Sequence, residues 1–280
     1  MILGQYTSQK GLMGIVENRE VWATNIRFLN DDAEFVHAND MFARWLPELV
    51  PDHPATRQHR QAFIDEIARG FALFRGGPIN QPGDGDLGSS EAIFVASFTE
   101  ATDLLSQWRG YCPQHNGYCM LFDPEQIALS AKHKFPHSEL VPCVYSDEEK
   151  KDRLRQILSA GLMEYIESDD RYHVTGQISL RINKLAAQCK HSGFHEEREH
   201  RLIVVLFTRN DVKFREGKYC LIPYVAVPLT RGLVTLNRVV IGPTPYPQLA
   251  AHGARELLMA EYSAGISTHI QHSAIPYRAW

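Results

Sequence analysis

Along much of the chain, apolar residues recur every three to four positions, which is the spacing that places them on one face of an α-helix. Helices are therefore predicted after Ser8, after Asn30 or Asp31, over 57–74, from near Glu100, over 147–167, over 174–190 and from Pro247 to about Tyr262. Ser8 and Asn30 or Asp31 suit the N-cap position, because their side-chain oxygens accept hydrogen bonds from the first turn. Residues 47–56 predict a loop between two of these helices.

Shorter segments rich in β-branched and aromatic residues predict strands. They are MILGQYT, VWATNI, AIFVASF at 92–98, a segment around GYCMLFD, residues 200–207, short segments near 220–227, VVIGP and the final THIQHSAIPYR. The glycine- and proline-rich stretch 76–90 interrupts this pattern and predicts a mobile loop. It lacks the spacing and the lysine of a phosphate-binding loop, so it carries no nucleotide assignment by itself.

Residues 194–207 read FHEEREHRLIVVLF, so a charged segment leads directly into six apolar residues. On a helix, Glu197 and Arg201 would form an ordinary pair four residues apart on a solvated face. The β-branched run LIVVLF instead favours a buried strand. The two-residue period of a strand would place Glu197, Glu199 and Arg201 on one face. The prediction is a strand with two carboxylates where the core sheet meets solvent.

The histidines of this segment do not predict a metal site. His195 and His200 are five positions apart, which on a helix turns them about 140° from each other, whereas a zinc-binding HExxH helix needs both on one face.

Composition narrows the class of protein. The chain has 280 residues, 44% hydrophobic and 22% charged, which is the balance of an ordinary globular protein, and we expect a single domain over 1–280. A net charge of −4 provides no global basic field for nucleic acid or membranes, although a local basic patch remains open. Five cysteines without a CxxC pair read as reduced thiols, and no apolar run reaches the roughly 18 residues that span a bilayer. We expect a cytoplasmic protein that does not enter membranes.

The segment SFTEATDLLSQWRGY joins a strand end to a predicted helix. Trp108 and Tyr111 are expected to be exposed near that strand end, where they could line a pocket with Ser97 and Phe98. The alternative is a core tryptophan with a capping serine or threonine.

Taken together, these stretches resemble a bacterial family of domains of unknown function that is found in abortive-infection and phage-defence loci. The shared motifs are Tyr6-Thr7, FLND at 28–31 with Glu34, Ser97-Phe98 with Trp108, Tyr111 and Gly117, Lys190 and Phe194 before Glu197-x-Glu199-x-Arg201, Gly242-Pro243 and S-x-IPYR at 273–278. The resemblance covers nearly the whole chain. It implies an anti-phage effector, and such a toxin needs an antitoxin or other inhibitory partner.

The order of the motifs also resembles that of ADP-ribosyltransferases, which use NAD as a substrate. This resemblance implies an α+β fold: a split β-sheet core with flanking helices and a C-terminal β-α-β element over 237–280. Glu199 would stabilise the oxocarbenium-like ribose and Glu197 would orient or deprotonate the nucleophile. The residues implied in NAD binding are Gln5, Tyr6, Thr7, Ser97, Phe98, Trp108, Tyr111 and Arg201. The acceptor would be a macromolecule, either RNA, such as mRNA, or a translation protein.

One residue departs from the transferase pattern. Gln5 stands where such enzymes place arginine or histidine, and Lys10, Arg27 or Arg109 could supply the missing charge. Two other functions remain open. Asp31, Glu34, Glu197 and Glu199 could hold Mg²⁺ in an enzyme that cuts nucleic acid. Alternatively, the E-x-E-x-R segment could be a structural ion-pair network in a non-catalytic sensor.

Overall fold

The computed structural model describes residues 1–29, 32–54, 56–74, 92–112, 116–229, 236–261 and 269–276. Three of the sequence predictions lie outside these residues: the loop at 76–90, the helix cap at Asn30 or Asp31, and the end of the terminal motif at 277–278.

Most helices agree with the amphipathic pattern, but the helix over residues 124–134 was not predicted. The helices are α1 (Gln9–Asn18), α2 (Asp32–Leu49), α3 (Arg57–Phe74), α4 (Leu105–Tyr111), α5 (Pro124–Lys134), α6 (Asp147–Glu167), α7 (Arg171–Gln188) and α8 (Pro247–Glu261), with short 3₁₀ helices η1 (Ile26–Phe28) and η2 (Ser192–Glu197). Helices α3 and α6 have the predicted bounds. Ser8 caps α1 as expected, because its hydroxyl oxygen accepts a hydrogen bond from the Gly11 N–H at 3.2 Å.

Three helices differ from the prediction in their bounds, and α7, which was predicted over 174–190, begins three residues earlier and ends two residues earlier. Helix α2 continues through Pro47 to Leu49 instead of ending at residue 46. Arg60 donates hydrogen bonds to the carbonyls of Pro47 and Val50, which satisfies the end of the helix. Helix α4 starts at Leu105 instead of near Glu100, because the Thr99 hydroxyl accepts a hydrogen bond from the Ala101 N–H and holds a turn there.

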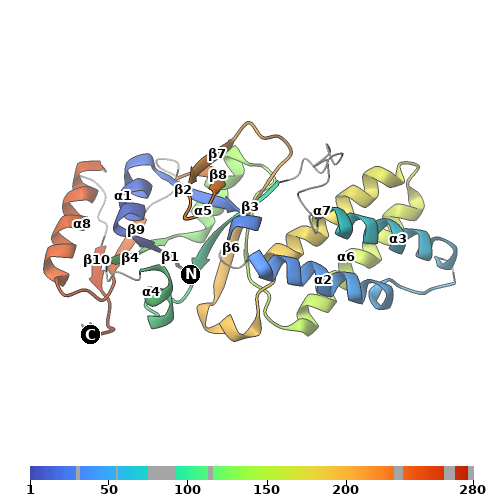
Figure 1. Cartoon of the computed structure of the whole chain (residues 1–280), viewed down its shortest axis with the longest axis horizontal. Coiled ribbons are helices and arrows are strands. Elements are labelled where there is room, and N and C mark those ends of the chain that lie inside the picture. Colours follow the sequence, from blue (N-terminus) through green and yellow to red (C-terminus); the bar gives the residue numbers. More distant parts are fainter. Residues whose placement is uncertain are drawn as a thin grey trace.

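Ten strands of the described residues form one mixed sheet (Figure 1). They are β1 (Leu3–Ser8), β2 (Glu20–Asn25), β3 (Ala92–Thr99), β4 (Gly117–Phe122), β5 (Glu139–Pro142), β6 (Glu199–Leu206), β7 (Val212–Glu216), β8 (Leu221–Pro228), β9 (Leu236–Ile241) and β10 (His269–His272). The main order is β10-β9-β4-β1-β3-β2-β8-β7, while β6 pairs with β3 and β5 pairs with β6. The expectation of a protein with both helices and a large sheet is confirmed.

The sheet divides at β3. Along one edge, β3 pairs with β6 over its whole length. Along the other edge, Thr99 pairs with Gly4 of β1, whereas Phe94 and Val95 pair with β2. Strands β1 and β2 therefore share one edge of β3 at opposite ends. At the far end of the sheet, β9, α8 and β10 form a β-α-β unit, because β9 and β10 are parallel.

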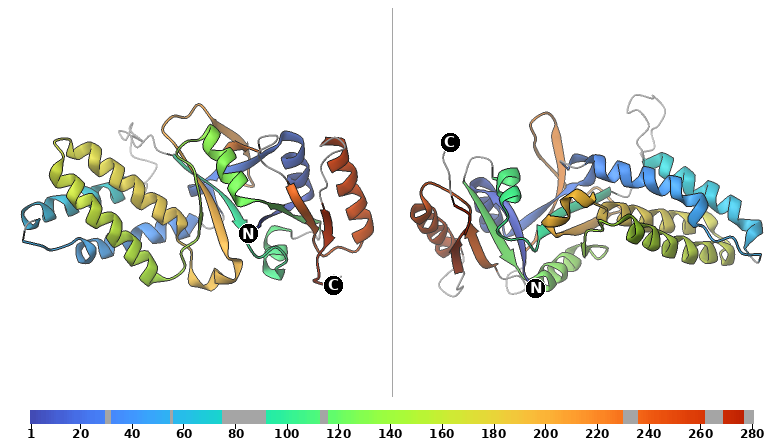
Figure 2. Two further views of the ribbon diagram at one scale, coloured as in Figure 1. Left: turned by 180° about the vertical axis from the view of Figure 1, so that it is seen from behind. Right: turned by 90° about the horizontal axis from the view of Figure 1, so that it is seen from below.

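Helices cover both faces of the sheet. A cluster of buried side chains joins one face to α2, α3, α6 and α7, and a second cluster joins the other face to α1, α5 and α8. The four helices of the first cluster lie together at one end of the molecule, and α8 lies at the other end (Figure 2). Among the described residues, no helix has the length and apolarity to cross a membrane.

Candidate active site

The three strands that carry the transferase-like motifs are neighbours in the sheet. Thr99 of β3 pairs with Gly4 of β1 on one side and with Glu199 of β6 on the other, and Ser97 pairs with Arg201. Directly paired residues in a sheet point to the same face. Segments almost 200 residues apart in the chain therefore present their side chains to one surface.

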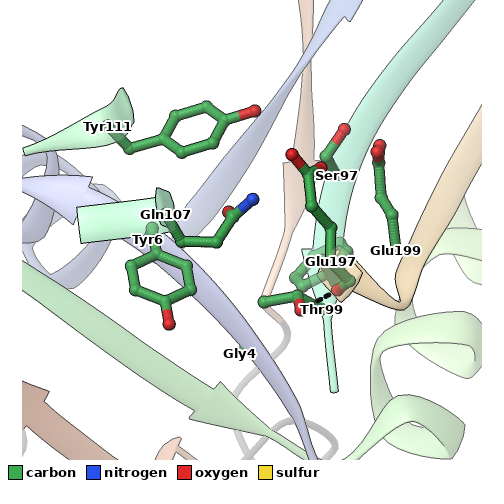
Figure 3. Close-up of a pocket in the computed structure, with 9 residues that line it drawn as sticks. Gly4, Tyr6, Ser97, Thr99, Gln107, Tyr111, Glu197 and Glu199 are labelled. Atoms are coloured by element: carbon green, nitrogen blue, oxygen red, sulfur yellow. Dashed lines mark hydrogen bonds between the residues drawn. The ribbon is translucent and has the colours of Figure 1, made fainter. Parts of the chain in front are cut away.

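These side chains enclose a small cavity beside α4 (Figure 3). Its volume is about 40 Å³, and its lining includes Gly4, Tyr6, Ser97, Phe98, Thr99, Gln107, Tyr111, Glu197 and Glu199. Tyr111 extends from α4 toward Ser97 and Glu197, whereas the hydroxyl of Tyr6 points away from the two carboxylates. The cavity has room for about one or two water molecules. Because Tyr111 is 43% exposed, movement of its ring is the simplest way to admit a larger molecule.

A buried ion network supports the two carboxylates. Lys190 donates to Glu199 and, at 2.6 Å, to Glu197, and it is itself 3% exposed. Arg201 donates to the other oxygen of Glu199 at 2.8 Å and to Glu34 at 3.3 Å. Glu199 is thus held on both sides by cations, whereas the Glu197 side chain remains 15% exposed. Three carboxylates and two cations give this cluster one net negative charge.

The network keeps Glu199, Lys190 and Arg201 ionised. Burial by itself would raise the pKa of Glu199, but Arg201 and Lys190 outweigh it and lower that pKa to about 2. Burial would lower the pKa values of Lys190 and Arg201, but the surrounding carboxylates, chiefly Glu199, raise both. Glu199 therefore carries its charge throughout the physiological pH range.

The predicted strand entry needs a correction at Glu197. This residue ends η2 and Arg198 follows it with φ 43°, a left-handed conformation, so strand β6 begins only at Glu199. Glu199 and Arg201 share a face as predicted, because they are two positions apart on β6. Glu197 reaches the same cavity from the turn before the strand instead of from the strand itself.

Trp108 is a core residue, which is the alternative given for this segment, and it is not among the residues that line the cavity. It is 3% exposed, its ring packs edge-on against Tyr6 with centroids 4.6 Å apart, and its Nε1–H donates to Asp103 at 2.8 Å. A Cβ on Gly242 would come within 2.8 Å of this ring, which explains the glycine of the GP motif by close packing. Of the two aromatics of α4, Trp108 and Tyr111, only Tyr111 is among the residues that line the cavity.

Other predicted NAD-binding residues are divided between the two faces of the sheet. Gln5 and Thr7 alternate with Gly4 and Tyr6 on β1, so they point to the opposite face. Thr7 lies under α1, since a Cβ on Gly11 would lie only 1.8 Å from its hydroxyl oxygen. The Phe98 ring packs in the second core cluster against Phe122, on the face opposite to Ser97 and Thr99, although Phe98 is one of the residues that line the cavity.

Two neighbouring residues were not assigned a site role from the sequence. Gln107 of α4 lines the cavity. Tyr145 accepts a hydrogen bond from the Glu199 N–H at 2.9 Å, and burial raises the pKa of Tyr145 to about 12. It also lines a wider cleft of about 450 Å³, which opens beside Lys190 and Glu34. Lys190 is part of the family motif that precedes Glu197 and Glu199, but it was not assigned a role at the site from the sequence. Its position shortly before the two glutamates is the feature of the sequence that could have indicated an ion pair with them.

The arrangement does not resemble a metal centre. The Lys190 ammonium occupies the position between Glu197 and Glu199 that a cation shared by both carboxylates would take. Across the described residues, no three His, Cys, Asp or Glu side chains are grouped to hold a metal. Glu34 meets the network through Arg201, and Asp31 lies outside the described residues. The chemistry available is that of two carboxylates, Glu197 and Glu199, which line a small cavity together with Ser97 and aromatic residues.

Comparison with known proteins supports the family relationship over part of the chain. Residues 107–202 match the model of a family described as "Protein of unknown function (DUF2971)". The matched segment covers less than half of the chain, and it contains Tyr111, Lys190, Glu197, Glu199 and Arg201. Neither the curated proteins nor the solved structures contain a match to the chain. The chain is therefore similar to a family of domains of unknown function in the segment that holds the ion network.

Proposed function

We propose that the protein is a mono-ADP-ribosyltransferase that consumes NAD. One observation carries the proposal: strands β1, β3 and β6 bear the three transferase-like motifs, adjoin in that order and line one cavity with Tyr6, Ser97 and Glu199. The division of the sheet at β3 agrees with the split sheet that the resemblance implies. The family match is compatible with this proposal and names no activity.

The reaction breaks the bond between nicotinamide nitrogen and ribose C1′ and forms a bond from C1′ to an acceptor oxygen or nitrogen. Nicotinamide leaves with the bonding electrons, so positive charge develops on the ribose. Glu199 is ionised at neutral pH and belongs to a cluster with net negative charge. It would stabilise that developing charge. Glu197, the more accessible carboxylate, would orient the acceptor and take its proton.

The geometry divides the other residues into those that touch substrate and those that position Glu199. Tyr111 would stack on the nicotinamide ring, because it is exposed at the mouth of the cavity. Ser97 and Gln107 would hydrogen-bond its amide. Arg201 and Lys190 are buried against Glu199, so they act as positioning residues. Tyr6 forms the wall of the cavity with Trp108 behind it.

The experiment incubates the purified protein with NAD, in the presence and in the absence of EDTA. Chromatography then measures the nicotinamide that is released. Glu197→Gln should lower the rate on the order of a hundredfold, because the variant cannot take a proton from the acceptor or water. Glu196→Gln is the matched control: its carboxylate is exposed and bonded to Ser106, so we expect activity near that of the intact protein. Release that is equal in both variants would refute the role of Glu197.

The burial of Lys190, Glu199 and Arg201 favours a second candidate, a non-catalytic sensor in which the network only stabilises the fold. The same assay decides between the candidates. Absence of nicotinamide release from the folded protein, with macromolecular acceptors present, would favour the sensor. Cleavage of nucleic acid that EDTA abolishes would instead favour a metal-dependent nuclease.

In the cell, we propose a toxin of an anti-phage system, acting on RNA or a protein and restrained by an antitoxin or other inhibitory partner. Expression of the gene alone should arrest growth, and Glu197→Gln should relieve the arrest. Co-expression of the partner should relieve it for the intact protein. If the gene expressed alone did not arrest growth, although the purified enzyme is active, the chain itself would restrain the activity and no inhibitory partner would be needed.

A further inference from the structure

The face of the sheet that carries the cavity continues onto β2, β8 and β7. Thr24 of β2 pairs with Val95 of β3, which lies two positions before Ser97 on the same face. Thr24 also pairs with Tyr224 of β8, and Tyr224 pairs with Lys213 of β7. Directly paired side chains share a face. The outer strands at the β7 end of the sheet (Figure 1) thus extend the surface on which Ser97 and Thr99 lie.

This extension carries aromatic side chains on β2 and β8 and basic side chains on β7. Trp22 is 40% exposed, and its ring lies over Tyr224 with centroids 4.4 Å apart and planes tilted by 33°. The Arg215 guanidinium lies 6.0 Å from the centroid of Trp22 and donates to the Thr24 hydroxyl at 3.3 Å. Lys213 is on the same face of β7, two positions from Arg215. We call these four side chains, Trp22, Lys213, Arg215 and Tyr224, the basic-aromatic strip.

The charge of this region differs from that of the whole chain. Between residues 209 and 218 there are four basic and two acidic side chains, whereas the chain has a net charge of −4. One carboxylate, Glu20, lies within the strip, where it accepts a hydrogen bond from Trp22 and pairs with Lys213 at 3.8 Å. The turn after β7 adds Lys218, whose ammonium lies over the ring of Tyr219, a residue that is 86% exposed. The region is a local basic patch with exposed rings.

We propose that the basic-aromatic strip binds single-stranded nucleic acid. An exposed indole offers a flat surface on which an unpaired base can stack, while Arg215 and Lys213 can neutralise the phosphates on either side of it. Paired bases would hide their faces from Trp22, so single strands fit better than duplexes. The strip shares a sheet face with the cavity at Ser97. If the proposed transferase function holds, the nucleic acid bound at the strip is therefore the acceptor of ADP-ribose.

The test measures binding of a fluorescein-labelled RNA of about twelve nucleotides, with DNA of the same sequence and an RNA duplex as comparisons. Fluorescence anisotropy is recorded at several salt concentrations. Trp22→Ala should weaken binding of the single strand about tenfold, and Trp22→Phe should restore most of it. The double variant Lys213→Gln with Arg215→Gln should also lower the dependence of affinity on salt. The charge-matched control is the double variant Arg57→Gln with Arg155→Gln, which removes two exposed arginines that pair with Asp52 and Asp152.

Equal affinity of the intact protein and both sets of strip variants would overturn the proposal, as would absence of binding to RNA and DNA at low salt. Preference for the duplex would also overturn it. Binding to RNA alone assigns RNA as the ligand, and binding to DNA alone assigns DNA. Because anisotropy needs no NAD, the strip can be established even if nicotinamide is never released and the transferase proposal fails. If Trp22→Ala lost nicotinamide release without losing RNA affinity, Trp22 would belong to the NAD site instead.

Discussion

Replacing Glu199 by glutamine tests whether the buried network stabilises the fold as strongly as its geometry indicates. The pKa of Glu199 falls from 4.5 to about 2, and a difference of about 2.5 corresponds to about 3 kcal/mol of preferential interaction with the charged form. Glutamine keeps the shape but loses that charge, while Lys190 and Arg201 stay buried. We therefore expect Glu199→Gln to lower the free energy of unfolding at pH 7 by about 3 kcal/mol.

The pH dependence of this loss follows from the direction of the pKa change. A lowered folded-state pKa contributes its full stability above the unfolded value, near 4.5, and this contribution disappears as the pH falls through about 2. The difference between the intact protein and Glu199→Gln should thus shrink to about 2 kcal/mol at pH 3.5. Urea unfolding followed by tryptophan fluorescence measures both values.

Glu164→Gln is the matched control for this experiment. Glu164 also pairs with an arginine, Arg181, which lowers the pKa of Glu164, but both side chains are about 40% exposed. Its loss should cost less than about 1 kcal/mol. The network would not stabilise the fold as proposed if Glu199→Gln lowered the free energy of unfolding no more than Glu164→Gln does. The same holds if the loss caused by Glu199→Gln were equal at pH 3.5 and pH 7. The destabilisation also means that activity of Glu199→Gln must be compared at equal folded fraction.

The remaining predictions concern α4 and its surroundings. Gly242→Ala should lower the free energy of unfolding by about 1–3 kcal/mol through overpacking. Gly253→Ala in α8 is the control and should not destabilise the protein, because a Cβ there meets nothing within 4 Å. Calorimetry measures the stability of both variants. Trp108→Ala should cost about 3–5 kcal/mol, while Tyr111→Ala should leave the melting temperature nearly unchanged and raise the KM for NAD. Asp103 accepts hydrogen bonds from the C-terminal segment, so Asp103→Asn should speed hydrogen exchange there.

The candidate site shows how far local sequence can predict tertiary contacts. Glu199 and Arg201 were placed on one face correctly, because the two-residue period of a strand is a local property. The segment around Trp108 leaves open whether its ring lines the pocket or packs in the core, because its burial depends on Tyr6 of β1 and on Gly242 directly after β9. Nothing within residues 100–111 could have indicated that contact.

The sequence by itself determined the elements that depend on local periodicity and capping. Helices α3 and α6 and the strand β6 follow from the spacing of apolar residues, and Ser8 marks the start of α1. Tertiary structure alone decided that Lys190 lies between two carboxylates. Val144 exchanges backbone hydrogen bonds with Gln188 and Lys190, and the Cys143 N–H donates to the Glu199 carbonyl, which brings the end of α7 beside β6. The reason is physical: side-chain direction is set by backbone period within an element, whereas ion pairs between elements depend on strand order and packing.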